Sequence, residues 1–273
     1  YFEARIAEQN MVSAGAGLAA SGRVPFVSTF AKFFVRAYDQ IEMASISGAN
    51  LKMVGSHAGI SLAADGPSQM SLCDLAFFRA FAHAIRPNGQ PSIRTFLPSD
   101  AVSAFRLTEL MANTPGMCYM RTHRPDVAVL YGEDEEFHLG GFKHLVDGED
   151  VLIVASGYMV HIALQAVEIL EEKFGLSASL VDAYSLPLDT EEILQIGDDC
   201  RGQILVVEDN YLGGVADEVT AAAAASDLGV TVKTLVVNNL PKSAKTPEDI
   251  LAMVGLTAED IAKAAQGMFD EAE

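Results

Sequence analysis

Short apolar runs alternate along the chain with longer segments in which apolar residues recur at three- and four-residue spacing. Such runs are typical of buried strands, and the longer segments have the periodicity of helices that cover a sheet. In the first part of the chain, strands are predicted at 24–28, 51–54, 93–96 and 117–120, and helices at 6–18, 30–46, 71–84 and 99–112. This alternation is the mark of a parallel sheet with crossover helices.

The periodicity fails after Arg124, where acidic residues cluster at 133–136. A charged, aperiodic stretch is typical of a solvated linker. We therefore predict a linker at 126–148, between a first domain at 1–125 and a second at 149–273. In the second domain, strands are predicted at 151–154, 178–181, 203–207 and 231–236, helices at 160–173, 190–196 and 215–225, and a surface helical segment from 247 to the end. The expected fold class is α/β, with two doubly wound domains.

Composition narrows the possible functions. Half of the 273 residues are apolar and the mean hydropathy is +0.22, which is ample material for a core. The formal net charge is −19, from 18 basic and 37 acidic residues, and this excludes an ordinary electrostatic nucleic-acid binder. No apolar run reaches the ~18 residues of a membrane span, so we expect no membrane partner.

The three cysteines, Cys73, Cys118 and Cys200, are odd in number and form no C-x-x-C pair. This argues against a disulfide framework or a zinc site, and it predicts a reducing, cytoplasmic compartment. The chain starts at Tyr1 with neither an initiator Met nor a signal-peptide pattern. We therefore expect the natural N-terminus to lie upstream.

Glu8 lies among small and apolar residues near the start of the predicted helix at 6–18. A carboxylate in such surroundings has a large desolvation cost and tends to acquire a raised pKa and a specific partner. The alternative is a glutamate that is simply stabilised by the helix macrodipole. Phe30 and Phe33 are three residues apart, so they share a helix face that could stack on a planar ring. The alternative for both rings is an ordinary helix–sheet core.

A histidine and a turn-rich loop follow the strand at 51–54. His57 stands in Gly-Ser-His-Ala-Gly at the carboxyl end of this strand, where α/β proteins collect ligands. The next loop presents Asp65 and Gln69 to the same crevice. A structural hydrogen bond for His57 and a plain turn at Asp65 are the alternatives.

Arg121 and Arg124 end the strand at 117–120. In so acidic a protein, arginines at a ligand edge are candidates for a phosphate clamp, with a surface ion pair as the alternative. The sequence contains no phosphate-cradling G-x-x-x-x-G-K-[ST] loop, no G-x-G-x-x-G fingerprint and no H-E-x-x-H pair. The carboxylates at Asp74, Glu208 and Asp209 have no metal-ligand spacing.

Taken together, the motifs resemble transketolase over nearly the whole chain. They are IAEQNM around Glu8, PFVSTFAKFFVRAYDQI from Pro25, GSHAGIS around His57, DGPSQM from Asp65, LPSD from Leu97, RTHRP from Arg121 and ILVVEDNYLGGVADEV from Ile204. The resemblance is to the carboxyl-terminal half of that enzyme, the pyrimidine-binding domain followed by the transketolase C-terminal domain. Deoxyxylulose-phosphate synthase and the β subunit of the pyruvate dehydrogenase first component share the glutamate-bearing helix but fit two of these motifs less well.

The resemblance implies a role for each candidate residue. Glu8 matches the glutamate that hydrogen-bonds the aminopyrimidine of thiamine diphosphate and favours its imino tautomer. Phe30 and Phe33 match the aromatic wall of the pyrimidine pocket, with Phe33 the expected stacking ring, and Gln69 falls near the reacting centre.

The remaining candidates match residues that hold the sugar phosphate. His57 matches a histidine that contacts the donor sugar and its phosphate end, so Glu8 and His57 are the expected catalytic residues. Asp65 matches a residue that binds a substrate hydroxyl, and Arg124 matches an arginine that binds the phosphate.

The chain also departs from the family pattern. Ala64 stands where many transketolases have Glu, and the segment 81–94 looks longer than in animal transketolases, as a surface loop would allow. The resemblance does not extend to the family's domain that binds the diphosphate and its divalent metal, Mg or Ca, and we expect that domain to lie outside this sequence. The resemblance therefore implies an N-terminal partner subunit or domain, a homodimer of this half and, for a split enzyme, a heterotetramer.

The expected activity is reversible transfer of a two-carbon ketol unit from a ketose phosphate to an aldose phosphate, with the isolated chain inactive. One alternative is another thiamine-dependent enzyme half, either like deoxyxylulose-phosphate synthase or an oxo-acid dehydrogenase β subunit. A second alternative is a non-catalytic dimerising module.

Overall fold

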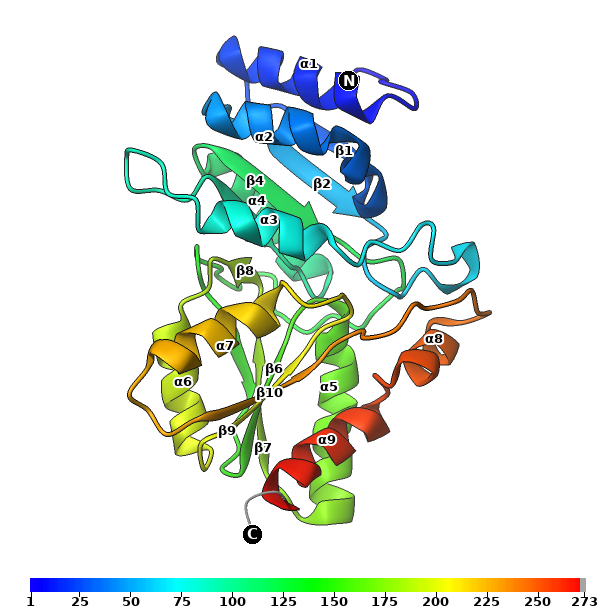
Figure 1. Cartoon of the computed structure of the whole chain (residues 1–273), viewed down its shortest axis with the longest axis vertical. Coiled ribbons are helices and arrows are strands. Elements are labelled where there is room, and N and C mark those ends of the chain that lie inside the picture. The colour runs from blue at the N-terminus through cyan, green and yellow to red at the C-terminus, as the bar shows by residue number, and fades with distance from the viewer. Residues whose placement is uncertain (271–273) are drawn as a thin grey trace.

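The computed structural model describes residues 1–270, which form two sheets of five strands each, stacked end to end with helices around them (Figure 1). The first sheet has the strand order β1-β2-β4-β3-β8 and the second has the order β10-β9-β6-β7-β5. We call the elements around these sheets the first and the second domain. The expected α/β class with two domains is confirmed.

The first domain contains α1 (Glu8–Ala20), β1 (Phe26–Phe30), η1 (Ala31–Ala37), α2 (Tyr38–Ile46), β2 (Lys52–Ser56), η2 (Ala63–Asp65), α3 (Asp74–Ala82), β3 (Ile93–Phe96), α4 (Ala101–Asn113) and β4 (Met117–Arg121). The rest of the chain contains β5 (Lys143–Val146), β6 (Val151–Ala155), α5 (Tyr158–Ile169), η3 (Leu170–Phe174), β7 (Ala178–Asp182), β8 (Ser185–Leu186), α6 (Thr190–Asp199), β9 (Gln203–Val207), α7 (Val215–Ala225), β10 (Thr231–Leu235), α8 (Pro247–Val254) and α9 (Ala258–Asp270). The predicted helical tail lies in α8 and α9, and its residues 271–273 are outside the described part.

Strands β1, β2 and β4 are parallel neighbours. Phe30 at the end of β1 lies opposite Ser56 at the end of β2, and Gly55 lies opposite Arg121 at the end of β4. Because parallel strands all end at the same edge, the segments that follow them meet there. This register brings the predicted site motifs to one edge of the first sheet.

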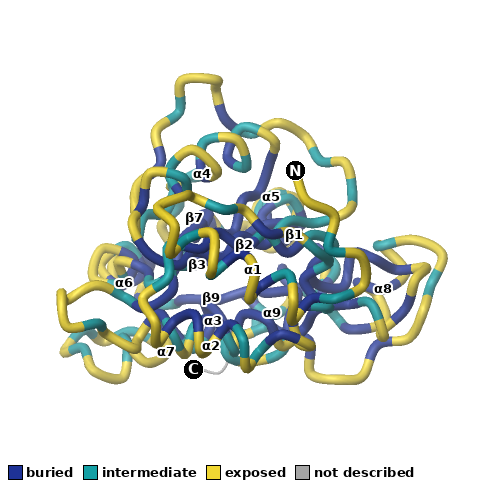
Figure 2. Tube along the Cα trace, turned by 90° about the horizontal axis from the view of Figure 1, so that it is seen from above, coloured by how far each residue is buried: buried dark blue, intermediate teal, exposed yellow. Residues whose placement is uncertain are grey.

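The second sheet is built around strands buried on both faces. Every residue of β6 and β7 is buried, which explains their continuous apolar runs, since both faces are covered by helices. Figure 2 shows buried chain through the interior and exposed chain on the outer helices and loops. No helix within residues 1–270 is long and apolar enough to cross a membrane.

Two of the predicted elements differ from the structure. The predicted helix at 30–46 is wrong at its start, because Phe30 still belongs to β1 and the chain then forms the short 3-10 helix η1 before α2. Backbone pairing of Phe30 with β2 holds it extended, in place of a first helical turn. The segment predicted as a linker contributes β5, which pairs antiparallel with β7 and covers its edge.

The two domains are joined by more than the connecting chain. Strand β8, which follows β7, pairs antiparallel with β3 of the first sheet. Side chains from the segment 60–72 are buried in the same apolar cluster as β6 and α5 of the second domain. The domains therefore share buried surface, and the loop after β2 lies between them (Figure 1).

Candidate active site

The candidate residues lie where β1, β2 and β4 end and where α1 begins. Glu8 is the first residue of α1, and its side chain is 7% exposed. Arg36 of η1 donates from Nη1 to Glu8 Oε1 at 2.8 Å. Glu8 is thus both a glutamate in the first turn of a helix and a buried carboxylate with a specific partner, so the structure combines the two alternatives.

Arg36 was not singled out in the sequence. Its guanidinium carbon lies 4.7 Å from the centre of the Phe33 ring, in cation–π geometry, while the same side chain holds Glu8. The three-residue spacing from Phe33 to Arg36 is the sequence feature that could have indicated Arg36. A 3-10 helix turns every three residues, so this spacing puts both side chains on the same face.

Three rings continue the site from Arg36 toward the loop after β2. Phe30 and Phe33 stack with centroids 5.4 Å apart and planes 3° from parallel. Phe30 also stacks on the imidazole of His57 at 4.0 Å and 17°. The rings are partly exposed at the sheet edge, which is the arrangement that binding of a flat ring requires.

His57 follows β2 in a left-handed backbone conformation with φ of 56°. Its Nδ1 is 2.9 Å from Ser56 Oγ. Burial lowers the pKa of His57, Arg124 lowers it further, and Asp65 acts in the opposite direction. Because the ordinary pKa of a histidine is already about 6.5, His57 is mainly neutral at pH 7.

Asp65 and Arg124 form an ion pair beside His57. Arg124 Nη1 lies 3.1 Å from Asp65 Oδ2, and the two side chains are 49% and 47% exposed. Both the ligand role and the surface ion pair proposed for Arg124 are compatible with this geometry. A continuous series of contacts therefore runs from Glu8 through Arg36 and the rings to His57, whose pKa responds to Asp65 and Arg124.

Gln69 is on the same loop, where its backbone N–H donates to Gly66 O at 3.0 Å in a turn. Its Oε1 is buried and has no hydrogen-bond partner among the described residues. A buried amide oxygen without a donor is costly, so this atom is available to a ligand.

Arg121, the other arginine considered for a phosphate clamp, is in a different place. It is buried, and it donates to Asp74 at 3.1 Å, to Asp209 at 2.7 Å and to Ser71 O at 3.3 Å. Burial alone would lower the pKa of Arg121, but Asp209 and Asp74 outweigh it and raise that pKa. The phosphate-clamp interpretation of Arg121 is wrong, because its donors are used by the protein's own groups.

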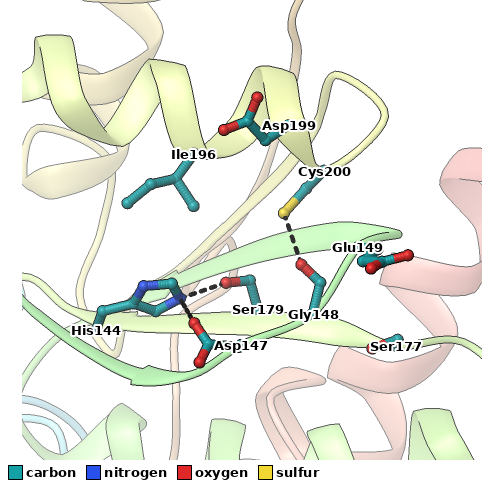
Figure 3. A pocket seen from close by; sticks show the side chains of 9 residues that line it. All are labelled: His144, Asp147, Gly148, Glu149, Ser177, Ser179, Ile196, Asp199 and Cys200. Atoms are coloured by element: carbon teal, nitrogen blue, oxygen red, sulfur yellow. Dashed lines mark hydrogen bonds and ion pairs between the residues drawn. The ribbon is translucent and has the colours of Figure 1, made fainter.

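Two cavities lie elsewhere in the molecule. One of about 330 Å³ opens in the second domain, and Figure 3 shows His144, Ser179 and Cys200 among the side chains around it. The other, of about 560 Å³, lies along the acidic loop at 132–143. None of the predicted site residues lines either cavity. Within residues 1–270, no group of three or more His, Cys, Asp and Glu side chains is arranged to hold a metal ion.

Fold and site together define a two-domain α/β protein with stacked, partly exposed aromatic rings at one edge of its first sheet. The family profile of the transketolase pyrimidine-binding domain matches residues 1–129, and that of the transketolase C-terminal domain matches residues 140–261. The chain belongs to the transketolase family. Among sequence relatives, human transketolase is 41% identical over the whole chain and mouse transketolase is 42% identical over 98% of it. The chain spans 42% of the length of each.

Solved structures agree with this assignment. A split-gene transketolase, solved as an inactive β4 tetramer, superposes with a TM-score of 0.83 at 30% identity. The match covers 96% of this chain and 81% of that one. A transketolase variant from Pichia stipitis has the same fold, with a TM-score of 0.76 at 23% identity over 95% of this chain and 36% of its own.

Proposed function

We propose that this chain is the carboxyl-terminal part of a thiamine-diphosphate-dependent transketolase, which transfers a two-carbon ketol unit reversibly between a ketose phosphate and an aldose phosphate. The observation that carries the proposal is the continuous series of contacts from Glu8 to His57. It combines a buried carboxylate, two parallel aromatic rings and an imidazole beside an arginine at one sheet edge.

The residues present fit the pyrimidine part of thiamine diphosphate. Phe30 and Phe33 are parallel and partly exposed, as a flat ring requires, and the buried Oε1 of Gln69 lacks a donor. We assign the diphosphate and its Mg or Ca ion to an N-terminal domain or subunit, since the matched relatives are more than twice as long as this chain.

When bound, thiamine diphosphate would supply a nucleophilic carbon and, in the cationic ring that carries it, an electron sink for the carbanion of the transferred unit. The role of this chain's own residues is to hold and move a proton and to orient the bound groups. Arg36 occupies only one oxygen of Glu8, so the carboxylate keeps acceptor capacity for a proton at a pyrimidine nitrogen. Burial of Glu8 keeps water from competing for that hydrogen bond.

The loop after β2 would hold the sugar phosphate. His57, mainly neutral at pH 7, can donate to or accept from a sugar hydroxyl. Asp65 can accept from a second hydroxyl, and the exposed face of Arg124 can bind phosphate oxygens in a bidentate manner. The Asp65–Arg124 pair orients both groups before substrate binds.

The proposed assembly is a homodimer of this half, or a heterotetramer if the enzyme is split. Large apolar side chains of the N-terminal elements are exposed and support a partner on that side. They are Leu18, Phe26, Val35, Met43 and Ile46. The three free cysteines support a cytoplasmic location.

The test is ketol transfer from xylulose 5-phosphate to ribose 5-phosphate with thiamine diphosphate and Mg²⁺. The chain is assayed alone and after addition of a transketolase N-terminal half. We expect activity only in the mixture, in keeping with the inactive β4 tetramer of the structural neighbour. Activity of the chain alone would contradict the split site. Activity with pyruvate in place of phosphosugars would indicate a different thiamine reaction, and no activity with either would favour a non-catalytic module.

A further inference from the structure

The loop that carries His57, Asp65 and Gln69 is held largely by the second domain. The loop places five apolar residues, three between His57 and Asp65 and two after Gln69, in one buried cluster with β6 and α5 of that domain. These residues are Ile60, Leu62, Ala63, Met70 and Leu72. Burial of this many apolar groups fixes the loop against the second domain more firmly than its exposed turns could.

The base of the loop is closed by a backbone hydrogen bond that one arginine supports. Gly59 N–H donates to Ser71 O at 3.0 Å, and Arg121 Nη2 donates to the same carbonyl at 3.3 Å. These contacts join the two ends of the segment that contains Asp65 and Gln69. His57 precedes Gly59 by only two residues, so the position of this closure also sets the position of the imidazole.

Asp209, in the turn after β9 of the second domain, lies against both parts of the closure. Its Oδ1 accepts from Arg121 at 2.7 Å. Its other oxygen lies against Gly59, where an added Cβ would be only 1.7 Å from Oδ2. Asp209 and Arg121 are 2% and 3% exposed, so water does not weaken this contact.

A second contact from the same domain reaches the turn that carries Asp65. Ala244 N–H donates to Ala63 O at 3.4 Å. Ser243 Oγ lies 2.3 Å from where a Cβ on Gly66 would be. Gly66 has φ of +81°, so the turn beside Asp65 depends on glycine for both backbone conformation and space.

We propose that Asp209 is a positioning residue for sugar-phosphate binding: acting through Arg121 and Gly59, it holds the loop of residues 57–72 in the geometry that His57 and Asp65 require. The inference gives the second domain a role in the site, and it rests on the proposed function for its substrate. Asp209 itself touches the loop, not the substrate.

The first test needs no partner and no substrate. Asp209→Asn keeps the shape of the side chain against Gly59 but removes the charge that holds Arg121. We expect amide hydrogen exchange in residues 57–72, and at Gly59 above all, to become at least tenfold faster. The matched control is Glu218→Gln, which weakens another contact between domains, from the buried Glu218 to the more exposed Arg79 and His83 at 2.7 Å each. It should leave exchange in the loop unchanged.

The second test uses the assembly with an N-terminal half. Asp209→Asn should raise KM for the ketose phosphate about tenfold or more. Its effect on the affinity for thiamine diphosphate should be smaller, because Glu8 and Phe33 lie outside the loop and only Gln69 lies within it. Glu218→Gln should change neither quantity. Unchanged loop exchange, or an unchanged KM in an active assembly, would overturn the inference. An inactive wild-type assembly together with faster loop exchange would overturn the proposed function and leave the loop contact established.

Gly59→Ala tests the same contact from the loop side if Asp209→Asn does not fold. The added methyl would meet Asp209 Oδ2 without removing a buried charge, and the φ of +69° at Gly59 means that it would also strain the backbone at the base of the loop. The same rise in KM is expected, and an unchanged KM would overturn the inference.

Discussion

At the scale of single residues, the site depends on how far each charged group is removed from water. Glu8 is buried, whereas its partner Arg36 is 46% exposed, so replacing the carboxylate costs little stability. Asp65 and Arg124 are both about half exposed, and their pair is likewise worth little to folding. These residues can therefore be changed to test function without unfolding the chain.

Glu8→Gln should lower kcat of the assembly with an N-terminal half by about 10²–10⁴-fold, because an amide cannot take and return the proton. Steady-state kinetics and a thermal melt of the same variant check this, and the melting midpoint should stay close to that of the parent. Glu3→Gln, a change at an exposed glutamate, is the matched control. A Glu8→Gln assembly with nearly full kcat would contradict the proposed mechanism.

Arg124→Ala should raise KM for phosphorylated sugars by about tenfold or more, since a charge-assisted bidentate contact is lost. Unphosphorylated sugars should show little change. Arg106→Ala, at an arginine on α4 outside the site, provides the control. Equal effects on both kinds of sugar would remove the phosphate role.

The same variant should raise the pKa of His57. Arg124 lowers that pKa and Asp65 raises it, so removing Arg124 takes away a like charge and frees an opposite one. A titration of the His57 imidazole by NMR, on the chain alone, measures the shift. A lower or unchanged pKa in the variant would contradict the observed placement of Arg124.

At the scale of elements, the aromatic wall is positioned by close contact between β2 and the start of η1. A Cβ on Gly55 would lie 2.5 Å from Tyr119 Oη and 2.9 Å from Ala31 Cα. Glycine at this point of β2 lets η1 approach the sheet, and Phe30 and Phe33 flank the contact. The geometry of the rings is thus set by a residue with no side chain.

Gly55→Ala should therefore reduce the free energy of unfolding by about 1–3 kcal/mol through overpacking. Gly17→Ala in α1 is the matched control, because an added methyl there meets nothing within 4 Å. It should instead stabilise the chain by about 0.5–1 kcal/mol through helix propensity. Urea unfolding of both variants measures the difference, and a Gly55→Ala variant as stable as the parent would contradict the close approach.

At the scale of the whole molecule, a buried carboxyl group lies where the two domains meet. Asp182 at the end of β7 accepts from Ser99 Oγ at 2.5 Å and from Tyr131 Oη at 2.6 Å. Burial raises its pKa to about 7 against the opposing effect of these two hydrogen bonds. The folded state thus binds this proton more tightly than the unfolded state, where the pKa is about 3.9.

The stabilisation from this group is greatest below pH ~4 and is lost as the pH rises toward 7. Tyr131→Phe removes one hydrogen-bond donor to Asp182 and so increases the free-energy cost of burying the ionised form of that carboxylate. It should lower the free energy of unfolding by about 1.5–3 kcal/mol at pH 8.5 and by less at pH 5. Urea unfolding at both pH values checks this. In an Asp182→Asn background, Tyr131→Phe should reduce the free energy of unfolding equally at the two pH values. An equal reduction at both pH values in the parent background would contradict the raised pKa of Asp182.

Much of this organisation was available from the sequence alone. Apolar periodicity determined the α/β class, the two domains and most strands, because sheets buried on both faces leave continuous apolar runs. The motifs also led to the prediction of Glu8, Phe30, Phe33, His57, Asp65 and Arg124 as site residues. Phe30, His57 and Arg124 meet at one edge because residues at the ends of neighbouring parallel strands share that edge.

Tertiary structure alone decided the rest. In the sequence, Arg121 and Arg124 are equivalent candidates at the end of one strand. In the fold, Arg121 is buried between two carboxylates, whereas Arg124 is about half exposed beside His57. Asp209 is 150 residues beyond Gly59 in the chain, and only the packing of the second domain brings them into contact. Local pattern fixes which face of an element is buried, whereas the partner of a buried charge depends on which distant segments the fold brings together.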